Sequence, residues 1–152
     1  MQERFKTFTV LIASINRSIR RIKTEEMAEF DLKSPHVSCI YYLYKANSLT
    51  AKELGDICGE DKAALSRSIE YLEANGYVTC SSKAQKRYRA PLELTEKGYR
   101  AGERIAEKID RILDTASEGL CAEDRTIMYQ SLALIATNLQ EICNQYEDHS
   151  GT

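Results

Sequence analysis

Residues 61–78 read DKAALSRSIEYLEANGYV, and this stretch decides the fold. Apolar residues recur at steps of four and three, at Leu65, Ile69 and Leu72, which predicts a short helix with one buried face. The opening aspartate is a suitable N-cap, and the Asn-Gly pair ends the helix because glycine readily takes a left-handed conformation after a last turn. The opposite face carries small side chains and an arginine and is predicted to be free: Ala63, Arg67, Glu70, Tyr71 and Ala74.

Two shorter helices are predicted before this one. Ser34 is a suitable N-cap and is followed by a proline, which favours a helix start at that point. Residues 50–53, TAKE, form a capping box, in which a threonine and a glutamate side chain cap the same helix start. The side chains predicted to pack inward are Val37, Ile40, Leu43 and Tyr44 in the first helix and Leu54, Ile57 and Cys58 in the second.

The stretch after residue 76 is β in character. Residues 77–81, YVTCS, and 90–95, APLELT, flank a polar basic loop at 83–89, KAQKRYR, and so predict a two-stranded hairpin. Pro91 has no N–H to donate to a ladder, so we expect it on an edge of the sheet. Thr95 is a suitable cap for a long helix that follows the hairpin.

The two ends of the chain carry matching apolar seams. Steps of three and four residues repeat in both, which is the spacing of a coiled-coil interface. Packing inside one monomer is one interpretation, but two long terminal helices around a small middle segment more readily form a layer shared between two subunits. The seams consist of Phe5, Phe8, Ile12, Ile15, Ile19 and Ile22 at one end, and Met128, Leu132, Ile135, Leu139, Ile142 and Tyr146 at the other.

The predicted element order is α-α-α-α-β-β-α-α, mainly helical with a small β-hairpin. A helix, a turn, a second helix and a two-stranded wing form the layout of a winged helix-turn-helix. We expect this DNA-binding lobe over residues 34–100, between an N-terminal dimerisation helix at 1–33 and C-terminal dimerisation helices at 101–152. The three parts are expected to form one continuous structural unit.

The composition agrees with a helical protein of this kind. The chain has 152 residues, of which 43% are hydrophobic and 29% charged, with only 7 Gly and 2 Pro. No apolar run approaches the roughly 20 residues that a membrane span needs, and the N-terminus lacks the features of a signal peptide. We therefore expect a cytoplasmic protein with no membrane partner.

The five cysteines are odd in number and widely spaced, without a C-x-x-C motif, which argues against a disulfide framework and a zinc site. With only two histidines, the sequence gives no metal cluster and no Cys-His nucleophile pair, so we expect no metal, no cofactor and no enzymatic activity. Cys39, Cys58 and Cys143 lie in apolar helix patterns and are expected in the core. Cys121, beside a helix start, is the best placed for a reactive thiol.

The charge distribution favours contact with nucleic acid at one surface. The net charge is −2, but residues 62–91 hold six cations against two acids. Small side chains on the free helix face permit close approach to base edges, and an arginine can bind guanine bidentately. The wing loop is expected to lie on the backbone or in the minor groove. The residues predicted to bind DNA are Thr50, Lys52, Lys62, Ala63, Ala64, Ser66, Arg67 and Glu70 in the helices, and Lys83, Lys86, Arg87 and Arg89 in the wing.

The sequence resembles the MarR family of bacterial transcriptional regulators. The resemblance rests on LTAKEL at 49–54, on residues 61–78, and on LELTEKG at 92–98, which follow the family's order and spacing. Ser66 and Arg67 fall on the family's Ser-Arg pair in the recognition helix. The family's wing-tip Asp-x-Arg is replaced by Gln-Lys-Arg at 85–87, and alanines stand at 63 and 64, where the family often has Ser or Thr.

The resemblance implies a homodimer that binds double-stranded operator DNA as a repressor. It also implies a cleft between the dimerisation helices and the DNA-binding lobe, for a small aromatic or lipophilic effector. The positions that would line this cleft are Arg17, His36, Tyr41 and Tyr42. Two alternatives remain open: a winged-helix protein-interaction module without operator binding, and a thiol-based redox-sensing regulator.

Overall fold

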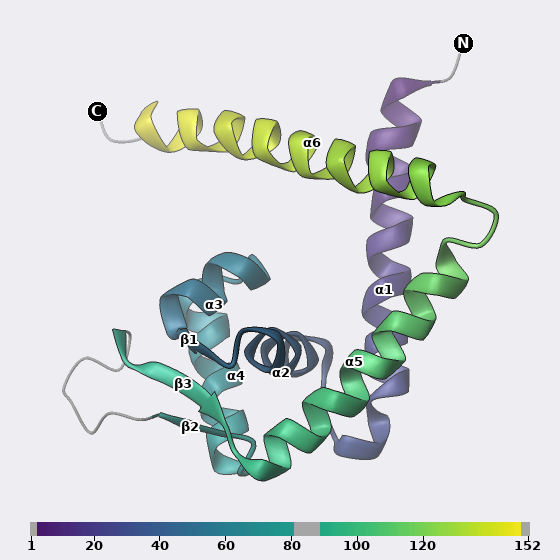
Figure 1. The fold of residues 1–152 in the computed structure, drawn as a ribbon. Coiled ribbons are helices and arrows are strands. Elements are labelled where there is room, and N and C mark those ends of the chain that lie inside the picture. The colour runs from purple at the N-terminus through teal and green to yellow at the C-terminus, as the bar shows by residue number, and fades with distance from the viewer. Residues whose placement is uncertain (1–2, 81–88, 150–152) are drawn as a thin grey trace. The chain divides into compact units, whose positions relative to one another are not determined.

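The protein is seen here as a computed structural model that describes residues 3–80 and 89–149 (Figure 1). The chain divides into two compact units, residues 1–110 and 111–152. The elements of the first unit are η1 (Lys6–Leu11), α1 (Ile12–Glu26), η2 (Ala28–Phe30), α2 (Ser34–Ala46), β1 (Ser48–Thr50), α3 (Ala51–Cys58), α4 (Lys62–Ala74), β2 (Val78–Cys80), β3 (Pro91–Leu94) and most of α5 (Glu96–Ala116). The second unit holds the end of α5 and the long helix α6 (Ala122–His149). The predicted mainly helical winged fold is confirmed, with one strand added.

The added strand is β1, so the sheet has three antiparallel strands in the order β1-β3-β2. β1 pairs with β3 from Ser48 opposite Glu93 to Thr50 opposite Pro91. The expectation that Pro91 lies on an edge strand is wrong, because β3 is the central strand. Proline is tolerated there because it is the first residue of the strand.

The helix starts are fixed by local hydrogen bonds. In α3 the Glu53 N–H donates to Thr50 Oγ1 at 3.2 Å and the Thr50 N–H donates to Glu53 Oε2 at 2.8 Å, which confirms the predicted capping box. In α4 the Ala64 N–H donates to Asp61 Oδ1 at 2.8 Å. The cap of α2 is Lys33 rather than the predicted Ser34.

One buried core joins the elements of the first unit. Leucine and isoleucine side chains from α2, α3, α4, β3 and α5 meet there: Ile40, Leu43, Leu54, Leu65, Leu72, Leu92 and Ile105. Ile57, which was expected to pack inward, is 48% exposed. The core supports α4 from one side and leaves its other side open.

The end of α4, the sheet and the start of α5 are joined at Thr95. Thr95 Oγ1 donates to Gly76 O at 2.6 Å and accepts from the Gly98 N–H at 3.0 Å. A Cβ on Gly98 would lie 2.0 Å from Tyr77 O, so only glycine permits this approach. This contact sets where α5 leaves the sheet.

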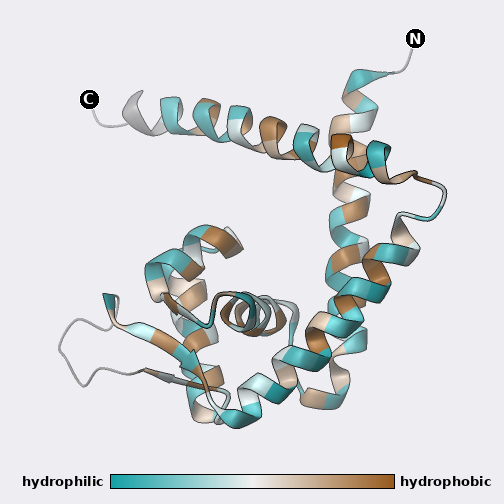
Figure 2. Ribbon diagram, in the orientation of Figure 1, coloured by the Kyte–Doolittle hydropathy of each residue, from teal (hydrophilic) through white to brown (hydrophobic). Residues whose placement is uncertain are grey.

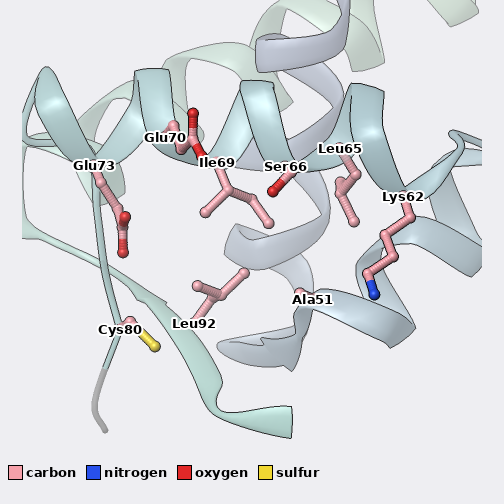
Figure 3. Close-up of a pocket in the computed structure, with 9 residues that line it drawn as sticks. All are labelled: Ala51, Lys62, Leu65, Ser66, Ile69, Glu70, Glu73, Cys80 and Leu92. Carbon is pink, nitrogen blue, oxygen red and sulfur yellow. The ribbon is translucent and has the colours of Figure 1, made fainter. Parts of the chain in front are cut away.

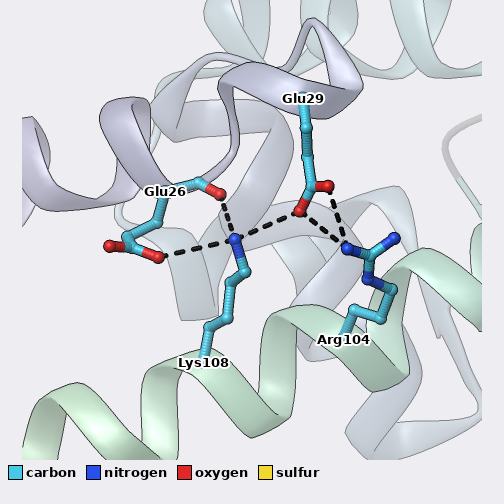
Figure 4. Close-up of polar contacts among 4 residues, drawn as sticks. All are labelled: Glu26, Glu29, Arg104 and Lys108. Carbon is cyan, nitrogen blue, oxygen red and sulfur yellow. Dashed lines mark hydrogen bonds and ion pairs between the residues drawn. The ribbon is translucent and has the colours of Figure 1, made fainter.

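α5 is also attached to the end of α1 and to η2 by four charged side chains (Figure 4). Lys108 Nζ lies 2.7 Å from Glu26 O and 3.1 Å from Glu29 Oε1, and Arg104 Nη2 lies 2.9 Å from Glu29 Oε2. The hydrogen bond from Lys108 lowers the pKa of the Glu29 carboxyl. The Glu26, Glu29 and Arg104 side chains are each more than 40% exposed, so these pairs contribute little stability on their own, but they connect α5 to the end of α1 and to η2.

The apolar seams of both terminal segments are exposed. Figure 2 shows apolar positions recurring along α1 and α6. All six seam residues at the N-terminal end are exposed, from Phe5 at 80% to Ile22 at 37%. On α6, Leu132, Leu139, Ile142 and Tyr146 are exposed, while Met128 and Ile135 are partly buried.

Candidate nucleic-acid interface

α4 presents one face to solvent and buries the other. Leu65 and Leu72 are buried, with Ser68 between them, and these side chains fix the rotation of the helix. The predicted contact residues on the outward side are exposed, apart from the half-buried Ala64: Lys62, Ala63, Ser66, Arg67 and Glu70. The face predicted for reading DNA is therefore present as an exposed helix surface.

Tyr71 is the exception on this helix. The sequence placed it on the free face, but it is half-buried in the structure. Its hydroxyl donates to Asp31 O at 2.8 Å, and its ring stacks on His36 with centroids 4.1 Å apart. Tyr71 therefore attaches α4 to the connection between α1 and α2.

The helix before α4 contributes two of the predicted contact residues. Lys52 is exposed on the first turn of α3. Thr50 is half-buried, and its hydroxyl both accepts from the Glu53 N–H and donates to Glu53 Oε2 at 2.9 Å. The hydroxyl of Thr50 is thus engaged in capping α3.

In the wing, Arg89 is exposed two residues before β3 begins at Pro91. Lys83, Lys86 and Arg87 lie outside the described residues. The wing contacts predicted for these three residues stay predictions.

A hollow of about 180 Å³ lies between α4 and the sheet (Figure 3). Ile69 from α4 and Leu92 from β3 point toward each other across it. Lys62 and Glu70, both predicted DNA contacts, border the hollow. The sequence did not predict it, because it arises where α4 meets strands that are distant in sequence.

A second hollow, of about 530 Å³, is bordered both by His36 and by the exposed face of α4. Lys33, His36, Glu60 and Arg67 contribute to its lining. His36 Nδ1 accepts the Lys33 N–H at 3.2 Å, so a neutral His36 carries its proton on Nε2. Burial, reinforced by the nearby Lys33 ammonium, lowers the pKa of His36 below its usual 6.5.

The four predicted effector residues lie in different settings. His36 lines the hollow beside Arg67, whereas Tyr41 and Tyr42 contact each other edge-on with centroids 5.3 Å apart. Tyr42 is half-buried, and burial raises its pKa. Arg17 is exposed on α1. An effector role for these residues stays a prediction.

The cysteines differ from the expectation at one position. Cys39 is buried and Cys58 and Cys80 are half-buried, but Cys143, which was expected in the core, is exposed on α6. Cys121 is exposed, and its Sγ accepts the Asp124 N–H at 3.4 Å at the start of α6.

Within residues 3–80 and 89–149, no group of three or more His, Cys, Asp or Glu side chains is arranged to hold a metal ion. The helices in this part of the chain include none with the length and apolar character of a membrane span.

Known proteins share the fold of this chain. A family model described as a winged helix DNA-binding domain matches residues 36–113, more than half of the chain. The matched residues run from the first turn of α2 to near the end of α5 and include the exposed face of α4. No curated protein matches the chain significantly.

Solved structures agree with the family model. A MarR family regulator from Neisseria meningitidis, NMB1585, is 18% identical, with a TM-score of 0.80 over 95% of this chain and 99% of that one. MepR of S. aureus, in complex with DNA, is 19% identical, with a TM-score of 0.77 over 90% of this chain and 99% of that one. NadR in complex with 4-hydroxyphenylacetate is 19% identical, with a TM-score of 0.74 over 90% of this chain and 96% of that one. The chain therefore belongs to the winged helix DNA-binding domain family, and it has the fold of the MarR family regulators.

Proposed function

We propose that the protein is a homodimeric, sequence-specific DNA-binding repressor of transcription whose operator binding is modulated by a small aromatic or lipophilic effector. The observation that carries this proposal is the exposed face of α4, with Arg67 at its centre. The opposite face of the helix packs on the core through Leu65 and Leu72. A regulator of this kind meets its operator in the cytoplasm.

The face of α4 has the chemistry needed to read a major groove. Ala63 and Ser66 are small and allow close approach to base edges, and the Arg67 guanidinium can bind guanine O6 and N7 bidentately. Lys62 lies at the first turn, where helix dipole and lysine charge both favour a phosphate oxygen. MepR, which has the same fold, binds DNA, and this supports a DNA-binding role for the present chain.

The exposed seams on α1 and α6 support dimerisation. Isolated apolar side chains on a surface are ordinary, but a periodic series of them favours burial against a partner helix. A two-fold dimer would present two copies of α4 to successive major grooves, about 34 to 36 Å apart.

The effector component rests on the aromatic residues of α2. Tyr41 and Tyr42 form a half-buried pair, and Lys45 Nζ lies 5.6 Å from the Tyr41 ring centroid. Such a surface can stack on an aromatic ring while a cation binds an acidic group. NadR, which has the same fold, binds 4-hydroxyphenylacetate.

The proposal is tested by selecting duplexes with the purified full-length chain from genomic promoter fragments. We then measure affinity for the selected duplex and for a scrambled duplex by fluorescence anisotropy at several salt concentrations. The proposal expects a clear preference for the selected duplex and an affinity that falls steeply as salt rises. Equal and salt-independent binding to both duplexes would contradict it and favour the protein-interaction module.

A further inference from the structure

A third hollow lies where the turn η2, the residue Tyr77 after the end of α4, and the first turns of α5 meet. Its volume is about 650 Å³, which is within the range typical of small-molecule sites in proteins. It shares no described lining residue with the two hollows that border α4. The hollow is therefore a separate feature of the first unit.

Positive charge gathers on the side of the hollow that α5 forms. Lys97, Arg100 and Arg104 all line it, and their spacing of three and four positions places them on one face of the helix. Among the described residues of the lining, Glu96 is the one acid. Three cations against one carboxylate favour an anionic occupant.

Two of these cations are held in place by neighbouring groups. Lys97 Nζ donates to Asn75 O at 2.8 Å and lies 4.2 Å from the centroid of the Tyr77 ring. Arg104 Cζ lies 5.1 Å from the centroid of the Phe30 ring. A cation over an aromatic face is attracted by the ring. Because these side chains are already ordered, binding an anion costs them less conformational freedom than it costs an ordinary surface lysine.

The two arginines keep hydrogen-bonding capacity for a ligand. Nη2 of Arg104 donates to both carboxylate oxygens of Glu29, at 3.0 and 2.9 Å, and Figure 4 shows the other terminal nitrogen pointing away from Glu29. A guanidinium has five N–H donors, so others remain. Arg100 pairs with Glu96, but these side chains are 75% and 81% exposed, so the pair is weak and a ligand can replace the carboxylate.

The length of the cationic row indicates what kind of anion it suits. Lys97 and Arg104 are seven positions apart, a rise of about 10 Å along the helix. A ligand with two linked anionic groups contacts more of this row than a single anion does. Ala101 lies between the cations on the same face and is 2% exposed, so its small side chain leaves the hollow open. Arginine pairs bidentately with phosphate oxygens, and lysine adds a point charge.

We propose that this hollow binds a small phosphorylated molecule with two adjacent phosphates, such as a nucleoside diphosphate or another diphosphate ester. Arg100 and Arg104 donate to the phosphate oxygens, and Lys97 supplies positive charge at the other end of the row. None of these three residues belongs to the exposed face of α4. Binding at the hollow therefore goes beyond the proposed function and is tested independently of it.

The first experiment titrates the full-length chain with inorganic pyrophosphate by isothermal calorimetry, at a constant ionic strength of about 0.15 M. Inorganic phosphate and sulfate are titrated in the same buffer. The proposal expects saturable binding of one pyrophosphate per chain, tighter by about tenfold or more than either single anion, because a second phosphate adds charge-assisted hydrogen bonds. No saturable binding of pyrophosphate, or equal affinities for the three anions, would overturn it.

Variants of Arg100 locate the site, since this residue pairs within its own helix and its loss leaves the contacts between elements in place. Arg100→Gln should weaken pyrophosphate binding by about tenfold, whereas Arg100→Lys, which keeps the charge, should retain most of the affinity. Arg21→Gln, which removes an exposed charge on α1, is the matched control and should bind like the wild type. Wild-type affinity in the Arg100→Gln chain would overturn the assignment.

DNA carries phosphates too, so a last comparison distinguishes a free ligand from a DNA backbone. Pyrophosphate is titrated into the wild type in the presence of excess scrambled duplex, and separately into Arg67→Gln. Both titrations should give the affinity of the wild type alone, and a chain that fails to bind DNA should still bind pyrophosphate. Competition by the duplex would overturn the assignment to a free small molecule. Loss of binding in Arg67→Gln would place the anion on α4 and overturn the site.

Discussion

Arg67 and Tyr71 lie about one turn apart on α4, but they differ in solvent exposure. Arg67 is exposed, whereas Tyr71 donates a hydrogen bond to Asp31 O, 40 residues away in the chain, and stacks on His36. A helical wheel shows which face of α4 packs on the core. It gives no information about contacts with residues outside the helix, such as the segment before α2. The sequence therefore predicted correctly that Arg67 is exposed, but it misplaced Tyr71 on the free face.

His36 leads to a prediction about pH. Its folded-state pKa is lowered, chiefly by burial, so the unfolded chain binds the proton more readily than the folded one. Its contribution to stability is present above about pH 6.5 and is lost as pH falls through the folded pKa. Protonation of Nδ1 would also break the hydrogen bond from the Lys33 N–H.

The measurement is the free energy of unfolding in urea between about pH 7.5 and 5. His36→Gln serves as the comparison, because glutamine at this position accepts the same cap hydrogen bond without titrating. The wild type should lose stability relative to His36→Gln as pH falls below 6.5. Parallel pH profiles for the two chains would show that His36 is not coupled to folding.

At the scale of elements, the contacts that sequence predicted are local ones. The capping box of Thr50 and Glu53, the Asp61 cap and the turn at Gly76 each involve residues within a few positions of one another. β1 was not predicted, because three residues directly before a capped helix carry no alternating pattern. Its pairing with β3 depends on residues more than 40 positions further along the chain.

The junction between the sheet and α5 gives a prediction at this scale. A Cβ on Gly98 would meet the Tyr77 carbonyl oxygen, so Gly98→Ala should destabilise the fold by about 1–3 kcal/mol, the usual range for overpacking. Chemical denaturation followed by circular dichroism measures the change.

Gly55→Ala is the matched control. A Cβ there would lie 3.0 Å from the end of the flexible Leu65 side chain and 3.8 Å, an ordinary contact distance, from Glu60 O. The higher helix propensity of alanine offsets these contacts. Its stability should stay close to that of the wild type. Equal losses in the two variants would mean that the contact with Tyr77 is not what requires glycine at position 98.

At the scale of the whole molecule, the exposed seams predict the oligomeric state. Ile19 is 43% exposed on α1, and burying it against a partner would contribute about 1.5–3 kcal/mol at each of two symmetric sites. Ile19→Glu should therefore raise the dimer dissociation constant by on the order of 100-fold or more. Analytical ultracentrifugation over a range of concentrations measures this constant.

The control for this experiment is Arg21→Glu, which changes the charge of an exposed residue outside the seam. This variant should dimerise like the wild type. A wild-type chain that stays monomeric at micromolar concentration would contradict the dimer. An Ile19→Glu chain that dimerises normally would contradict the role of the seam on α1.

One part of the candidate site could be predicted from the sequence, and another part could not. The exposed positions on α4 follow from one helix, so the spacing of its apolar residues predicted them. The hollow shared by His36 and Arg67 depends on how separate helices pack. Residue spacing within one helix carries no information about this packing.

The most direct test of the account is the operator preference of Arg67→Ala, measured by fluorescence anisotropy on the selected duplex and on a scrambled one. Because Arg67 is proposed to bind a base edge, its loss should weaken operator binding by about 1–3 kcal/mol and remove most of the preference, with the fold intact. Arg111→Ala, which removes another exposed arginine, should bind both duplexes like the wild type. If Arg67→Ala and the wild type bind the operator with equal affinity, the face of α4 is not the reading surface.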